Sequence, residues 1–144
     1  MAATLPLRLD AHQHFWRYDA AAYPWIGRDM GRLRRDFQPD DLRPLLDAAG
    51  LDGCIAVQAR ACESETGQLL ELAERYPWIR AVVGWVDLCS DDLEQSLERW
   101  AQNPVLRGFR HQLQVAGRKL TRRVYAKPGV QSGANHLAAP GAGL

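Results

Sequence analysis

The hydrophobic and polar positions along the chain repeat one unit, in which a short apolar run is followed by apolar residues at helical spacing. The short runs predict four strands, over residues 5–11, 54–58, 81–88 and 105–113. The helical stripes between them predict three helices, over residues 39–49, 64–76 and 90–101. Strands and helices that alternate in this way indicate a parallel sheet with right-handed crossovers. We therefore expect an α/β fold.

Residues suited to helix ends mark where these helices begin and stop. Pro39 suits a first turn because its φ is fixed and it lacks an N–H, and Gly50 suits the residue after the last turn. Ser64 and Ser90 are the expected N-caps of the other two helices. Pro44 conflicts with the first helix unless that helix begins late.

A stretch rich in aromatic residues, from Phe15 to Phe37, separates the first strand from the first helix. It is longer than an ordinary connection, so we expect a structured loop over the strand ends. Trp16 and Trp25 are first interpreted as packing residues. The alternative is that they wall a sugar-sized pocket.

Two histidines, His12 and His14, stand at the downstream end of the first predicted strand. Side chains at i and i+2 of a strand share a face, and their Cα atoms lie ~6–7 Å apart. Both imidazoles can therefore reach one metal ion or one substrate oxygen. The alternative is two histidines whose ring nitrogens are satisfied by backbone hydrogen bonds.

Polar side chains follow the other predicted strands as well. In parallel α/β proteins the carboxyl ends of the strands carry the chemistry. Gln58 and Arg60 could instead end a strand and face solvent, and Asp87 could be a turn or cap residue. Arg110 and His111 point to opposite faces by strand alternation, so we expect one of them to face the site.

Composition limits the class of protein without naming a function. The chain has 144 residues, 47% hydrophobic and 24% charged, which favours one soluble domain. No apolar run approaches a membrane span, and the first residues lack a secretory pattern. Three cysteines, Cys54, Cys62 and Cys89, have neither metal-ligand nor redox spacing, which suits buried thiols in a reducing cytoplasm.

Residue usage changes near position 114. Residues 1–114 contain 13 basic and 17 acidic residues, whereas residues 115–144 contain five basic residues, no acid and both lysines of the chain. The second segment has no helical or strand period, so we expect a basic, disordered tail after the folded part. A nucleic-acid-binding arm is the weaker interpretation, because Tyr125 is its only aromatic residue.

Six motifs along residues 7–114 together resemble the amidohydrolase-related family. Within it they are most similar to sugar-lactone hydrolases of the L-fuconolactonase and L-rhamnonolactonase kind. The motifs are DAHQHFW, YPWI, RRDFQPDDL, VQAR, GWVDL and LRGFRHQLQ. The resemblance implies the N-terminal half of a (β/α)8 TIM-type barrel, with its site at the carboxyl ends of about four strands.

The resemblance also implies roles for the strand-end residues. His12 and His14 would bind a divalent metal, zinc by preference, or contact the substrate with no metal required. Arg110 and His111 would be catalytic, with Arg110 stabilising the oxyanion formed when water attacks a lactone carbonyl. Gln58, Arg60 and Asp87 occupy positions where such barrels bind the sugar lactone, and Trp16 from the aromatic stretch is a further candidate for binding it.

A complete barrel of this type needs ~250 residues, and the resemblance stops near Gln114. We therefore expect a truncated or frame-shifted hydrolase with little or no activity alone, because strands five to eight are missing. The alternative is a non-catalytic sugar- or metal-binding remnant. Open sheet edges predict a chain that is insoluble, partly folded, or paired with a second copy as a homodimer that completes the core.

Overall fold

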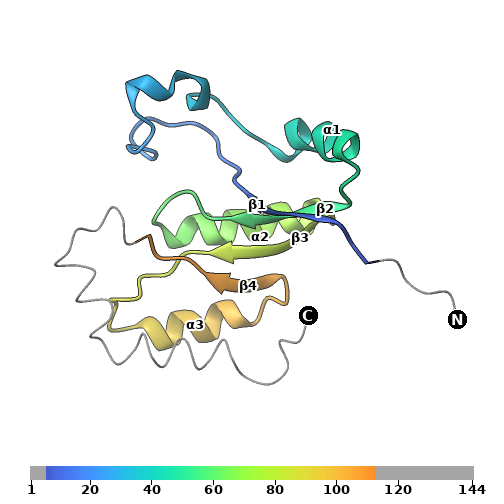
Figure 1. The fold of residues 1–144 in the computed structure, drawn as a ribbon. Coiled ribbons are helices and arrows are strands. Elements are labelled where there is room, and N and C mark those ends of the chain that lie inside the picture. Colours follow the sequence, from blue (N-terminus) through green and yellow to red (C-terminus); the bar gives the residue numbers. More distant parts are fainter. Residues whose placement is uncertain (1–5, 113–144) are drawn as a thin grey trace, which may run out of the picture.

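The structure is a computed structural model that describes residues 6–112, and its helices and strands alternate along the chain (Figure 1). The strands are β1 (Leu9–Gln13), β2 (Gly53–Val57), β3 (Ile79–Gly84) and β4 (Leu106–Phe109). The helices are the 3₁₀ helix η1 (Arg28–Leu33), α1 (Pro39–Ala49), α2 (Glu63–Arg75) and α3 (Leu93–Ala101). All four strands are parallel, in the order β1-β2-β3-β4. The predicted α/β fold is confirmed.

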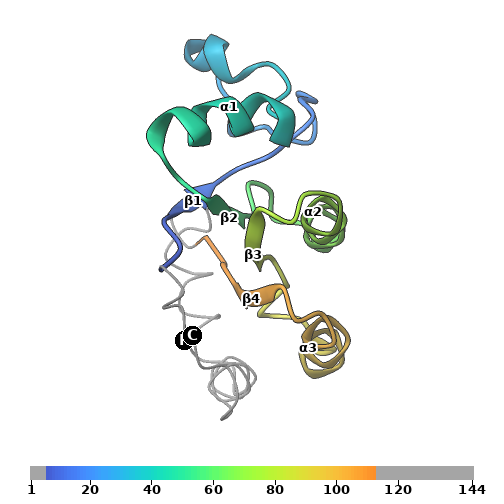
Figure 2. The same ribbon diagram turned by 90° about the vertical axis from the view of Figure 1, so that its right-hand side faces the viewer.

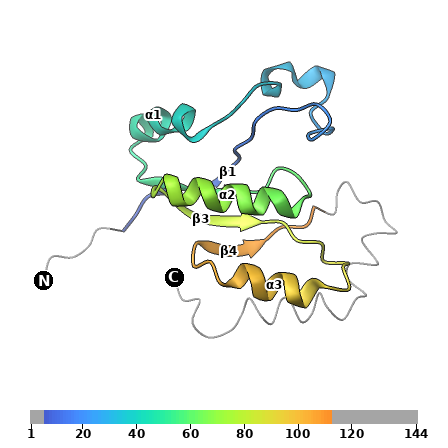
Figure 3. The same cartoon turned by 180° about the vertical axis from the view of Figure 1, so that it is seen from behind.

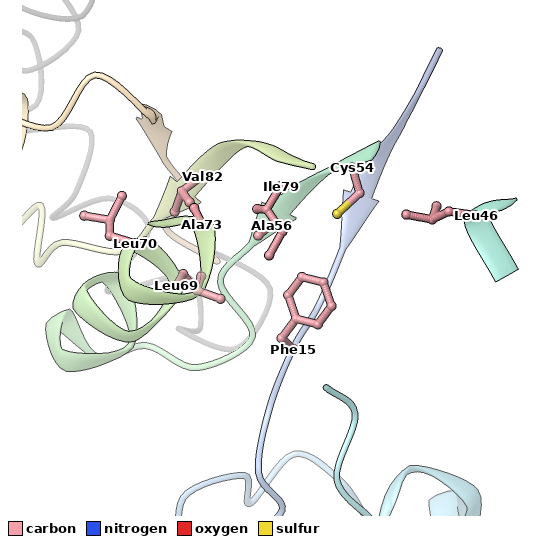
Figure 4. Packing of buried hydrophobic residues seen from close by; sticks show 9 residues of the cluster. All are labelled: Phe15, Leu46, Cys54, Ala56, Leu69, Leu70, Ala73, Ile79 and Val82. Carbon is pink, nitrogen blue, oxygen red and sulfur yellow. The ribbon is translucent and has the colours of Figure 1, made fainter. Parts of the chain in front are cut away.

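Helices α2 and α3 cover one face of the sheet, and α1 lies beyond the β1–β2 side (Figures 2 and 3). A cluster of buried residues fills the space between the strands, α1 and α2 (Figure 4). Its members are Phe15, Leu46, Cys54, Ala56, Leu69, Leu70, Ala73, Ile79 and Val82. Cys54 and Ala56 are two residues apart in β2 and both belong to this cluster, so Ile55 between them points to the opposite face.

The strands lie where the pattern predicts them, but their ends differ. The first strand extends to Gln13, so His12 lies within it. The third strand ends at Gly84 and leaves out Trp85, although the apolar run continues to Leu88. The reason is that the backbone N–H and C=O of Trp85 both bond to the hydroxyl of Thr66 and to no neighbouring strand.

The first helix begins and ends as predicted. It starts at Pro39, and its first turn is closed by the Asp41 carboxylate, which accepts the backbone N–H of Gln38 at 2.9 Å. Gly50 follows the last turn with φ 66°, a left-handed conformation that favours glycine. Pro44 is accommodated inside the helix.

The other two N-cap predictions were wrong. Cys62 is the N-cap of α2 and Asp92 is the N-cap of α3, instead of Ser64 and Ser90. Neither of these caps makes a side-chain hydrogen bond to its helix. The first turns instead contain buried residues, Glu65 and Thr66 in α2 and Leu93 in α3.

The aromatic stretch is a structured loop at the carboxyl end of β1, as predicted (Figure 1). Trp16 and Phe37 close its base through two backbone hydrogen bonds of 3.0 and 2.9 Å. Trp16, Tyr23 and Ile26 of this loop form a second buried cluster together with Ala59, which follows β2. Trp16 thus makes the packing contacts that were expected of it.

Between residues 6 and 112 no helix combines the length and the apolar character that crossing a membrane requires. The predictions made for residues 115–144, a separate basic and disordered segment, lie outside the described residues.

Candidate functional site

The imidazoles of His12 and His14 meet at the carboxyl end of β1. Their Nε2 atoms are 3.2 Å apart, and their ring centroids are 4.8 Å apart with the rings at 73°. The pairing of β1 with β2 shifts register between Asp10 and Gln13, so this part of the strand is irregular. The predicted convergence of both rings on one point is therefore present in the structure.

Hydrogen-bond partners define the tautomers of the pair. His14 Nδ1 donates to the backbone carbonyl of Val57 at 2.8 Å, because a carbonyl only accepts. Arg110 Nη1 lies 3.2 Å from His12 Nε2, and a guanidinium only donates, so His12 Nε2 is an acceptor. Burial is the main cause that lowers the pKa of His14, with smaller contributions from the charges of His12 and Arg110. A neutral His14 with a proton on Nδ1 also presents a lone pair at Nε2, so two acceptor nitrogens face each other.

Arg110 reaches this pair from the end of β4, and Gln58 at the end of β2 holds it there. The Gln58 side-chain oxygen Oε1 accepts Arg110 Nε at 3.1 Å and Nη2 at 2.8 Å, and its backbone carbonyl accepts Nη2 at 2.9 Å. Gln58 is 0% exposed. Burial lowers the pKa of Arg110, yet a guanidinium keeps its charge at neutral pH. Across residues 6–112 the ion pairs are Arg43–Asp47 and Arg99–Glu63, so the charge of Arg110 faces no carboxylate at salt-bridge distance.

The first turn of α2 fastens the loop that follows β2. Glu65, 2% exposed, accepts the backbone N–H of Ala59 at 2.9 Å and of Arg60 at 2.8 Å, and it also accepts the Tyr23 hydroxyl at 3.4 Å. Burial is the main cause that raises the pKa of Glu65. Because the bonded amides follow Gln58 directly, Glu65 fixes the backbone from which Gln58 reaches Arg110.

The next residue of the helix, Thr66, fastens the end of β3 in a similar way. Its hydroxyl accepts the N–H of Trp85 and donates to the carbonyl of Trp85, each at 2.8 Å. The indole of Trp85 stacks on the ring of His111, with centroids 5.6 Å apart and planes at 27°. His111 Nδ1 is buried without a hydrogen-bond partner among the described residues.

Strand alternation predicts that one of Arg110 and His111 faces the site, and Arg110 is the residue in contact with His12 and Gln58. His111 contacts Trp85 instead. A catalytic role for either residue stays a prediction.

Three other predicted site residues lie apart from the cluster formed by His12, His14, Gln58 and Arg110. The guanidinium of Arg60 donates to Ser64 Oγ at 3.1 Å and lies 5.7 Å from the ring centroid of Tyr23. Trp16 donates its indole N–H to the carbonyl of Arg35 at 2.9 Å. Arg60 and Trp16 both line a cavity of about 690 Å³ between the aromatic loop and α2.

The third of these residues, Asp87, accepts the backbone N–H of Cys89 at 2.8 Å and so stabilises the turn after β3. This contact matches the turn interpretation of Asp87. Substrate binding by Asp87, Arg60, Trp16 and Gln58 is a prediction that no contact in this structure tests.

Sequence reasoning missed Glu65 and Thr66. The available signal was weak, because an acid and a threonine in the first turn of an amphipathic helix are common and usually exposed. Their burial follows from the packing of α2 against the ends of β2 and β3, which no local period encodes.

The histidine pair fits two positions of a metal site. Two nitrogens bound to one tetrahedral zinc at about 2.0–2.1 Å lie about 3.3–3.4 Å apart, close to the separation of these two Nε2 atoms. Both nitrogens carry lone pairs, as metal ligands must, although the lone pair of His12 accepts Arg110 Nη1 in this structure and would have to release it to bind a metal. Over residues 6–112 no group of three or more His, Cys, Asp or Glu side chains could hold a metal, so the described residues alone would offer a metal these two histidines and no third such ligand.

Two curated proteins named L-fucono-1,5-lactonase are similar to this chain. The protein from Burkholderia multivorans is 57% identical over 108 residues, which cover 75% of this chain and 36% of the relative. The protein from Burkholderia ambifaria is 39% identical over 110 residues, which cover 76% of this chain and 38% of the relative.

Two crystal structures of an amidohydrolase from Burkholderia multivorans, one with bound zinc and one with bound HEPES, share the fold. Each is 49% identical with a TM-score of 0.82 and covers 93% of this chain and 46% of the solved chain. The chain thus spans between about a third and a half of the length of the relatives that it matches. Its four parallel strands and their helices correspond to part of an amidohydrolase TIM barrel.

The model of the family described as amidohydrolase matches residues 9–136, which is most of the chain. With this match, the chain belongs to the amidohydrolase family.

Proposed function

We propose that this chain carries the carbonyl-binding part of a sugar-lactone hydrolase site. The observation that supports it most is the position of Arg110. Its guanidinium, held by the buried Gln58, directs Nη1 to the acceptor nitrogen of His12, which lies next to Nε2 of His14 at the strand ends. A cation beside two acceptors suits a carbonyl that becomes an oxyanion when water attacks it.

In the proposed reaction, water adds to the lactone carbonyl carbon, the ring C–O bond then breaks, and the proton taken from the water passes to the departing ring oxygen to give a hydroxy acid. Arg110 donates to the carbonyl oxygen and stabilises the negative charge that develops there. The Nε2 lone pair of His14, which is not the acceptor of Arg110, accepts a hydrogen bond from the attacking water and orients it. His14 is a weak proton acceptor because its pKa is lowered, so we assign removal of the water's proton to a base outside residues 6–112.

A divalent metal, zinc by preference, would be held by His12 and His14 and would supply Lewis-acid polarisation of the carbonyl or the water. The proposed substrate is a sugar lactone such as L-fucono-1,5-lactone, because two relatives carry that name. The 144-residue chain alone should hydrolyse it slowly or not at all, because four strands do not enclose the substrate.

The test uses the hydroxy acid product, L-fuconate, which cannot hydrolyse during the measurement. Calorimetry should detect L-fuconate binding to the 144-residue chain, and Arg110→Lys should weaken that binding about tenfold, because lysine lacks the planar fork of donors. Arg107→Lys is the matched control, since Arg107 is exposed on the same strand. Equal binding by the parent and the Arg110→Lys variant would contradict the proposal.

Lactone hydrolysis by the same preparation tests the second half of the proposal. A rate at the spontaneous level is expected. Rapid hydrolysis that disappears in His12→Ala would instead mean that the chain contains the complete proton-transfer machinery.

The alternative is a non-catalytic module that binds a sugar or a metal. The two facing lone pairs of His12 and His14 favour it. It predicts zinc binding that His14→Ala removes, together with L-fuconate binding that Arg110→Lys leaves unchanged.

A further inference from the structure

Gln58 is the least exposed polar residue of the strand-end cluster, and its side chain makes its hydrogen bonds to other residues of the chain. It is 0% exposed, and its side-chain oxygen accepts two donors of Arg110. The Gln58 amide nitrogen lies 3.5 Å from the carbonyl of Arg60. A side chain engaged at both ends in this way has little capacity left for a ligand.

The three bonds from Arg110 to Gln58 use one edge of the guanidinium. Nε and Nη2 both bond to Gln58, whereas Nη1 is the nitrogen next to His12. A fork held by two of its nitrogens cannot rotate away from the histidine pair without losing those bonds. Gln58 therefore determines where the free edge of the guanidinium points.

The chemical type of the partner also matters. A carboxylate at this position would bind the same two nitrogens and would neutralise the guanidinium. An amide oxygen binds them and leaves the positive charge available to a developing oxyanion. Glu65, the buried acid closest in sequence, has its carboxylate engaged by the amides of Ala59 and Arg60.

We propose that Gln58 is the positioning residue of Arg110, which it holds toward His12 without neutralising the guanidinium charge. This inference rests on the proposed role of Arg110 in binding the lactone carbonyl. It replaces direct substrate binding by Gln58 with an indirect role through Arg110.

Two variants of the 144-residue chain test separately whether Gln58 positions the guanidinium of Arg110 and whether it leaves the guanidinium charge intact. Gln58→Met keeps the side-chain length and removes the acceptor. Gln58→Glu keeps the acceptor and adds a negative charge. Gln95→Met and Gln95→Glu are matched controls, because they make the same chemical changes on an exposed face of α3.

The first readout is the ¹⁵N–¹H signal of the Arg110 Nε–H group, assigned by its loss in Arg110→Lys. In the parent and in Gln58→Glu this proton should exchange slowly with water, because it is hydrogen bonded. In Gln58→Met its exchange should accelerate at least tenfold. An Nε–H signal that is equally protected in Gln58→Met would overturn the proposal.

The second readout is the affinity for L-fuconate. Both Gln58 variants should bind L-fuconate about tenfold more weakly. In Gln58→Met the guanidinium of Arg110 is no longer held in position, and in Gln58→Glu its positive charge is neutralised. The Gln95 variants should bind like the parent. A Gln58→Glu variant that binds as tightly as the parent would overturn the charge part of the proposal.

Failure of the inference differs from failure of the proposed function. If Arg110→Lys does not weaken L-fuconate binding, the proposed function fails, and the Nε–H exchange still reports whether Gln58 positions Arg110. If Gln58→Met does not fold by circular dichroism, Gln58→Asn takes its place in the exchange measurement. Its shorter amide should also speed Nε–H exchange, and unchanged protection there would contradict the inference.

Discussion

At the scale of single residues, buried polar side chains organise the strand ends. Gln58 and Glu65 are almost without exposure, and each accepts more than one hydrogen bond. A buried acceptor is stable only when donors surround it, so each of these residues fixes the backbone or side chain that supplies them. His12 and Arg110 are more exposed and depend on this support.

Glu65 should give the protein a characteristic pH dependence. The pKa of Glu65 in the folded state is raised above the ordinary value of 4.5. At a pH between 4.5 and this raised pKa, the folded state therefore binds more protons than the unfolded chain. The free energy of unfolding should therefore fall as pH rises through this window. Glu65→Gln should lack this component, which urea unfolding at a series of pH values would measure.

Glu74→Gln, an exposed change on the same helix, is the control and should follow the parent at every pH. Parallel pH curves for the parent and Glu65→Gln would contradict the assignment of the effect to Glu65.

At the scale of elements, α2 makes side-chain hydrogen bonds to the backbone that follows two strands, β2 and β3. Its first turn places Glu65 against the loop after β2 and Thr66 against the residue after β3. After β2 the N–H of Gln58 still donates to Val83 of β3, and from Ala59 onward Glu65 accepts the backbone N–H groups instead, while Thr66 bonds to the backbone of Trp85 after β3. The strand ends and the site thus depend on one helix.

Thr66→Val should destabilise the protein by about 2 kcal/mol, because it keeps the shape but leaves the N–H and C=O of Trp85 without their partner. Thr66→Ser, which retains the hydroxyl, should lose much less. Midpoints of urea unfolding measure both. A Thr66→Val variant as stable as the Thr66→Ser variant would mean that water replaces the hydroxyl.

Gly53 permits the close approach of β2 to the residue that precedes β3. A Cβ at this position would lie 2.1 Å from the backbone carbonyl oxygen of Trp78. Gly53→Ala should cost about 1–3 kcal/mol, since backbone must move to relieve the overlap. Gly31→Ala, which meets no atom within 4 Å, is the control, and thermal unfolding of both variants is the measurement.

At the scale of the whole molecule, the sheet formed by residues 6–112 has two edge strands and one face that no described helix covers. β1 and β4 each pair on one side within the described residues, and α2 and α3 cover the same face (Figure 2). Leu7, just before β1, is 54% exposed. Unpaired strand edges beside apolar surface favour association.

We expect the 144-residue chain to self-associate, with a second copy covering the open face and edges. Size-exclusion chromatography with light scattering should give a mass that rises with protein concentration. A monodisperse monomer with a cooperative thermal transition would contradict this expectation.

Local pattern sufficed for the order of elements, the parallel sheet and the paired histidines. Helical and strand periods depend on neighbours in sequence, and so does the shared face of His12 and His14. Helix starts were less predictable, because Cys62 and Asp92 precede helices whose first turns contain buried residues.

The sequence by itself thus determined which elements form, in which order, and that strand ends carry polar groups. Only the tertiary structure decided which of those groups meet. Arg110 joins Gln58 and His12 while His111 turns to Trp85, and Glu65 and Thr66 become part of the support. The physical reason is that contacts between residues far apart in the chain depend on strand register and helix packing, which no local period contains.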